Sequence, residues 1–281
     1  MPALRSFSSP QSQALFEAVV GLDVPATRQA LKAGANALEL DADLAPRGLL
    51  NCVLGACEEM REELHARAGT ARQHAGGSSE SGRAPDAIAT DLQASLTGLS
   101  ARVHGVVSAV LAKAPSLPLG VFHNGMLPSH LAAFMGLGST FSLLVDKGMD
   151  PAAVSPYGRT AAHWAARGGH TGMLRRLSAW GVPLDKQDQG GATPAHLAAG
   201  EGLVLVMREL KRLGAQLDKK NTKGLTASDV LDAVDALQGR EWRKWELRFE
   251  SQKAAERLSS KLGSVEQPEA SIASSRPKSR F

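Results

Sequence analysis

Two histidines, two arginines and a tryptophan lie within thirteen positions in the stretch GRTAAHWAARGGH, residues 158–170. Histidine ligates metals and exchanges protons near neutral pH, and arginine binds anions. These residue types therefore suit either a metal site or a reactive site. Which of the two they form, if either, depends on whether the elements that carry the side chains bring them together.

The motifs of the common catalytic sites are absent from the sequence. There is no G-x-S-x-G nucleophile turn, no phosphate-binding loop ending in G-K-S or G-K-T, and no H-E-x-x-H zinc motif. The acidic run at 57–67 places Glu59 and Glu63 on one helical face. Carboxylates that perform acid chemistry flank a pocket, and an exposed helix provides none. We therefore expect no catalytic residue and no cofactor, and hence not an enzyme.

The two cysteines, Cys52 and Cys57, are the only thiols of the chain. Five positions apart on a helix, they point about 140° away from each other. They suit neither a disulfide nor the C-x-x-C pair of a zinc site. We expect no metal site here, and free thiols indicate a reducing compartment.

The chain repeats itself with a period of 33 residues, and the histidines belong to this repeat. Four glycines, three histidines and three threonines recur in step, and paired alanines and leucines follow the same spacing. The aligned positions are Gly125, Gly158, Gly191 and Gly224; His130, His163 and His196; and Thr160, Thr193 and Thr226.

Each repeated position has a physical role in a helix–turn–helix unit. Thr193 before Pro194 is typical of a helix N-cap followed by proline at the first helical position. Paired alanines let this short helix pack closely against its neighbour. A second helix ends at Gly181 in one copy and at Gly214 in the next, both of which suit a left-handed C-terminal cap. The Pro-, Gly- and Asp-rich stretch 182–191 connects one unit to the next.

These residues resemble the ankyrin repeat, whose usual core reads T-P-L-H-x-A and then A-x-x-G-H. The best copies are ATPAHLAAGEG (192–202) and RTAAHWAARGGH (159–170), whereas LTASDV (225–230) has Asp229 in the histidine column. The resemblance covers residues 122–231. It implies an all-α solenoid of five to six stacked units with projecting finger turns and a concave binding face. The Ala-, Gly- and Arg-rich composition suggests a bacterial source.

The segments outside the regular repeats fit the same architecture. We expect an ankyrin domain over 11–238, in which an N-terminal repeat at 11–44 precedes a degenerate second repeat drawn out into a long helical hairpin at 45–118. The apolar stripes of 47–73 and 87–113 are helical. An aromatic helix at 239–262 would cap the stack. We expect residues 1–10 to be flexible and the basic tail 263–281 to be disordered.

The repeated histidines cannot share one metal ion. They lie on successive repeats, and packed helices are about 8–10 Å apart, whereas zinc needs ligand atoms at about 2 Å. The resemblance implies instead that each histidine forms hydrogen bonds with the backbone of a neighbouring turn, and His170 occupies the second histidine position of the motif. The predicted structural residues are His130, Thr160, His163, Thr193 and His196.

The net charge of +4 comes entirely from the end of the chain. From Gly239 onward there are ten Lys and Arg and six Asp and Glu, so the remainder sums to zero. This argues against a nucleic-acid or membrane-binding face on the repeats. No apolar run of signal-peptide or transmembrane length is present. We expect a cytoplasmic protein, with secretion into a host cell without a cleaved signal peptide as the alternative suggested by the serine-rich start.

The resemblance implies protein–protein recognition by the finger tips and the exposed side of each first helix, in a monomer that acts as an adaptor. The partner itself is not specified. The alternative is an enzyme or enzyme regulator with its chemistry in the hairpin or the C-terminal region. Two interpretations of Trp180 stay open: its ring either faces a partner or packs on Leu213. The predicted partner-binding residues are Tyr157, Arg159, Arg167, Trp180, Gln189, Glu201 and Lys223.

Overall fold

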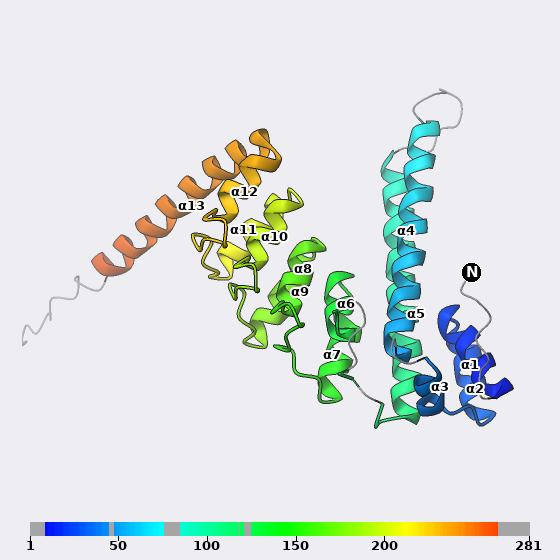
Figure 1. Cartoon of the computed structure of the whole chain (residues 1–281). Coiled ribbons are helices and arrows are strands. Elements are labelled where there is room, and N and C mark those ends of the chain that lie inside the picture. Colours follow the sequence, from blue (N-terminus) through cyan, green and yellow to red (C-terminus); the bar gives the residue numbers. More distant parts are fainter. Residues whose placement is uncertain (1–8, 45–47, 76–84, 118, 121–124, 264–281) are drawn as a thin grey trace, which may run out of the picture.

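The structure of the protein, a computed structural model, describes residues 9–44, 48–75, 85–117, 119–120 and 125–263. This part of the chain consists of α-helices joined by turns and contains no β-strand (Figure 1). The predicted flexible start at 1–10 and the predicted disordered tail at 263–281 lie outside it, except for residues 9, 10 and 263.

The helices form two parallel rows, as expected for stacked helix–turn–helix units. Neighbours within each row are in contact, and each first helix is followed by its second helix. The first-helix row is α1 (Pro10–Val20), α4 (Leu49–Ala75), α6 (Pro128–Phe134), α8 (Ala161–Arg167), α10 (Pro194–Gly200) and α12 (Ala227–Val234). The second-helix row is α2 (Val24–Lys32), α5 (Pro85–Lys113), α7 (Gly138–Asp146), α9 (Thr171–Ala179) and α11 (Val204–Arg212), with α3 (Ala37–Asp43) between α2 and α4 and α13 (Ala236–Gly263) after α12.

Alanine pairs allow the first helices to pack closely. Ala165 and Ala166 on α8 are completely buried, and their counterparts on α6 and α10 are buried to the same extent. The second helices complete the core with leucines such as Leu177. Because an alanine has no bulk beyond Cβ, it sets a short distance between neighbouring helices, and this spacing is repeated along the stack.

The turns between units depend on glycines at two kinds of position. Gly191 has a φ of +69°, and a Cβ on it would lie 2.8 Å from the backbone nitrogen of Thr222 in the next connection. Gly136 has a φ of +71°, and a Cβ on it would lie 2.6 Å from Nδ1 of His170. Glycine is therefore required at both places, for its left-handed backbone and for the close approach of a neighbouring unit.

The long helices α4 and α5 occupy the place of one unit in the stack. At their base, α4 lies between α1 and α6, and α5 lies between α2 and α7. Their apolar stripes meet there, with Val53, Leu54 and Cys57 buried on α4 and Val103 and Val107 buried on α5. Beyond this base the pair projects far past the ends of the short helices (Figure 1).

The C-terminal helix α13 begins at Ala236, three residues before the predicted start, and covers α12. Trp242 is completely buried and donates a hydrogen bond from Nε1 to Oγ of Ser228 at 2.9 Å. Trp245 and Phe249 continue the stripe, with ring centroids 5.1 Å apart. Lys211 on α11 forms ion pairs with two glutamates of α13, and residues 251–257 are exposed.

Candidate functional site

The repeated histidines connect one unit to the next. Nδ1 of His163 accepts a hydrogen bond from the backbone N–H of Thr160 at 3.1 Å, which caps α8. Its Nε2–H donates to the carbonyl of Ala192, 29 residues further along the chain, at 3.1 Å. His130 and His196 form the same pair of bonds in their own units, and Thr193 caps α10.

Burial fixes the charge state of His130 and His163. It lowers the pKa of His163 to about 4 and also lowers the pKa of His130, so both rings are neutral at neutral pH. A neutral ring is what the bonds require, because one nitrogen must accept and the other must donate. Among the described residues, no group of three or more His, Cys, Asp or Glu side chains is placed to hold a metal ion.

The connections between units form a continuous edge, which we call the finger edge, at residues 148–160, 181–193 and 214–226. Gln189 donates from its backbone N–H to the carbonyl of Tyr157 at 3.0 Å and from Nε2 to the carbonyl of Pro156 at 2.7 Å. In the next step, the backbone N–H of Thr222 donates to the carbonyl of Gly190 at 3.1 Å. Each finger is thus held by hydrogen bonds to its neighbour.

Three predicted partner-binding residues form ion pairs between units. Arg159 Nε lies 3.0 Å from Oδ2 of Asp188, and its guanidinium lies 5.6 Å from the ring centroid of Trp164. Arg167 Nε lies 3.2 Å from Oε1 of Glu201, and both of these side chains are about half exposed. These groups hold adjacent units in register and also present charge at the surface.

Tyr157 and Lys223 are two predicted residues of the finger edge whose side chains are exposed. Tyr157 is 56% exposed, and one side of its ring rests against Gly125 of the preceding finger. Lys223 is exposed, and its backbone N–H donates to Oδ1 of Asn221. Val154 and Leu225 add exposed apolar side chains to the same edge. The finger edge therefore combines an aromatic ring, apolar groups and a cation.

Trp180 lies at the end of α9, directly before the finger segment 181–193. Its ring stacks on Phe141 of the preceding unit, with centroids 5.3 Å apart, and the residue remains 37% exposed. This contact is with the preceding unit, and the packing on Leu213 of the following unit stays a prediction. Trp164 is buried and meets the edge of Phe134, as expected of a ring wedged between units.

Asp188 and Phe141 were not among the predicted residues. Asp188 accepts the Arg159 guanidinium and also the backbone N–H groups of Gly190 and Ala192, so it shapes the finger turn from within. Its position before a Gly-Gly pair is the signal that could have identified it, because aspartate commonly caps such turns through its own side chain.

Comparison with protein families agrees with this geometry. Residues 129–221 match the family model of ankyrin repeats, in three copies. The matched region runs from α6 to the end of the third regular unit, and it contains the bridges from His130 to Ala153 and from His163 to Ala192 and most of the finger edge. This part of the protein therefore consists of ankyrin repeats, which generally serve as modules for protein–protein interaction.

One described segment, Thr90–Lys113 within α5, is long and apolar enough to cross a membrane by length and composition. A third of its most apolar window is buried, and the base of α5 packs against α4, α2 and α7. Core helices of proteins that do not span a membrane meet the same criterion, and Val103 and Val107 of this segment are buried.

Proposed function

We propose that this protein binds a partner protein through the finger edge and the neighbouring exposed side of the first helices, and that it performs no chemistry on that partner. The observation that carries the proposal is the hydrogen-bonded row of fingers, which presents Tyr157, Leu225 and Lys223 from a rigid scaffold. Tyrosine is enriched among the residues that dominate binding energy at protein interfaces.

Preorganisation supports this use of the edge. The Gln189 and Thr222 bonds fix the fingers before any partner arrives, so binding orders fewer groups and loses less conformational entropy. The Arg167–Glu201 pair lies at the C-terminal ends of α8 and α10, and it is exposed enough to be contacted at the rim of an interface that extends along the first helices. Rim charges of this kind affect association rate and specificity more than affinity.

The cytoplasmic location, the alternative of export into a host cell, the monomeric state and the bacterial source stay predictions from the sequence. The partner is a protein whose contact surface must complement an aromatic ring, two apolar side chains and a lysine. A mixed surface of this type favours a folded partner with a shallow pocket for Tyr157.

Site-specific photocrosslinking in cells tests the proposal. A benzophenone amino acid is introduced at Tyr157, and, as the matched control, at the exposed Lys147 at the end of α7. We expect a discrete adduct from position 157 that is absent from position 147. The same adducts from both positions, or none from 157 with the protein folded, would refute the assignment of the finger edge.

Substitutions of exposed side chains test the finger edge more cleanly than alanine replacement of the arginines does. Arg159→Ala and Arg167→Ala would each break an ion pair between units and could weaken the stack itself. Tyr157→Ser and Lys223→Glu change only exposed side chains. We expect Lys223→Glu to reduce recovery of the partner crosslinked from position 157, and Tyr157→Ser to reduce recovery of the same partner in a pull-down without crosslinking, while the helical signal in circular dichroism is unchanged.

A further inference from the structure

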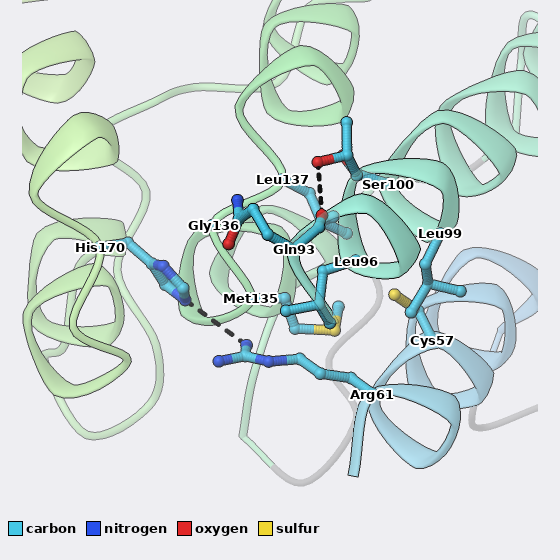
Figure 2. A pocket seen from close by; sticks show the side chains of 11 residues that line it. Cys57, Arg61, Gln93, Leu96, Leu99, Ser100, Met135, Gly136, Leu137 and His170 are labelled. Atoms are coloured by element: carbon cyan, nitrogen blue, oxygen red, sulfur yellow. Dashed lines mark hydrogen bonds between the residues drawn. The ribbon is translucent and has the colours of Figure 1, made fainter. Parts of the chain in front are cut away.

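A pocket lies at the edge opposite the fingers, where the long hairpin meets the regular units (Figure 2). It has a volume of about 340 Å³ and is bounded by α4, α5, the turn at 135–137 and His170. We call this side, formed by the turns at 135–137, 168–170 and 201–203, the short-turn edge. A volume of this size lies at the lower end of the range for small-ligand sites, and it suits a single side chain or a small organic acid.

One wall of the pocket is apolar. Leu96 and Leu99 on α5 face Met135 and Leu137 of the turn across the space (Figure 2). This wall can hold a short aliphatic stem. Gln93 and Ser100, also on α5, add an amide and a hydroxyl group to the lining.

Arg61 supplies the only formal charge of the lining residues. Its side chain reaches from α4 toward His170, with Nη1 at 3.5 Å from Nε2 of the ring (Figure 2). Burial and the Arg61 charge lower the pKa of His170 to about 4, so that ring is neutral at neutral pH. Burial raises the pKa of Cys57 to about 11, so its thiol is neutral too.

In the part of the chain that the structure describes, the Arg61 guanidinium forms no ion pair. Glu58 and Glu62 lie near it along α4, but neither lines the pocket. Arginines elsewhere in the stack, such as Arg159 and Arg175, each reach a carboxylate of the next unit. The guanidinium of Arg61 touches His170 through one nitrogen only, which leaves N–H donors for an incoming anion.

We propose that this pocket binds a carboxylate on a short aliphatic stem, either a glutamate side chain of a bound protein or a small free dicarboxylic acid. The carboxylate pairs with Arg61 in the planar, two-point geometry that guanidinium favours. The stem packs on Leu96 and Met135, and Gln93 or Ser100 donates to a remaining oxygen. This site is separate from the finger edge and does not depend on the function proposed for it.

Three probes test the proposal by calorimetry or by chemical-shift titration of the full-length protein. Glutarate represents the free acid, N-acetyl-glutamate amide represents a protein side chain, and glutaramide is the neutral isostere of glutarate. We expect at least one carboxylate probe to bind with a dissociation constant on the order of 1 mM, as for one charge-assisted pair. Glutaramide should bind at least about tenfold more weakly. Whichever carboxylate binds more tightly identifies the source of the ligand.

Two variants localise the binding. Arg61→Gln should weaken the carboxylate probes by about tenfold or more. Arg102→Gln removes one positive charge from the same hairpin outside the pocket, and it should leave affinity within about twofold. Circular dichroism shows whether each variant is folded. Equal binding of glutaramide, no binding of either carboxylate, or unchanged affinity in folded Arg61→Gln would overturn the proposal, and none of these results bears on crosslinking from Tyr157.

Discussion

The buried ring of His163 makes the stack sensitive to mild acid, and its pKa allows the effect to be calculated. The ring is completely buried, with Nδ1 accepting from the backbone N–H of Thr160 and Nε2–H donating to the carbonyl of Ala192. A second proton would have to enter on Nδ1, directly opposite the N–H that it accepts from. Protonation therefore breaks the cap of α8 and buries a charge at the same time.

The magnitude follows from the two pKa values. The pKa is 6.5 for an ordinary histidine and about 4 for His163 in the folded protein. Because the folded value is the lower one, the unfolded chain binds more protons below pH 6.5, and stability falls as the pH decreases from about 6.5 to about 4. At about pH 5 the loss from this one residue is about 2 kcal/mol. Below about pH 4 both states are protonated and the loss no longer grows.

Urea unfolding followed by far-ultraviolet circular dichroism measures this loss at about pH 7.5 and about pH 5. The matched variant is His163→Gln, because glutamine at the third helical position can still accept from the backbone N–H of Thr160 but does not titrate. We expect the wild type to lose about 2 kcal/mol more than the variant between the two pH values. Equal losses in the two proteins would refute the reasoning.

Three further predictions concern packing. Trp242→Ala should lower the free energy of unfolding by about 3–5 kcal/mol, measured in urea, because it empties the space between α12 and α13; an unchanged midpoint would show that α13 does not stabilise the stack. Gly191→Ala should destabilise by more than about 1 kcal/mol, since its backbone is left-handed and Thr222 is in the way; a thermal melt equal to that of wild type would contradict this. Phe141→Ala should shift Trp180 emission to the red by exposing the stacked ring, and no shift would exclude the stacking.

The repeat architecture could be predicted because its causes are local and recur. The 33-residue period, the Thr–His pairs that cap α8 and α10 and the alanine pairs each act within one unit or between adjacent units, so one copy explains the others. The neutral state of His163 also follows from its place in the motif. Apolar residues at steps of three and four positions predicted the two hairpin helices. Val53 and Val103 belong to these apolar stripes, and both are buried in the structure.

The remaining features depend on distances that a single sequence does not contain. Arg159 was predicted as a binding residue, and its pairing with Asp188 depends on the offset between two fingers. Trp180 stacks on Phe141 of the preceding unit, a contact that joins positions far apart in the sequence. Arg61 and His170 are 109 positions apart, and only the angle at which the hairpin leaves the stack brings them together.

Hydrogen exchange of the protein alone and in complex with the partner found by crosslinking tests the central claim most directly. If the finger edge binds the partner, the backbone amides at 155–159, 188–192 and 221–225 should exchange more slowly in the complex. Amides of α9 and α11, which form the opposite row, should be unaffected. Protection confined to the hairpin or to α13, with unchanged exchange in all three finger segments, would contradict the account.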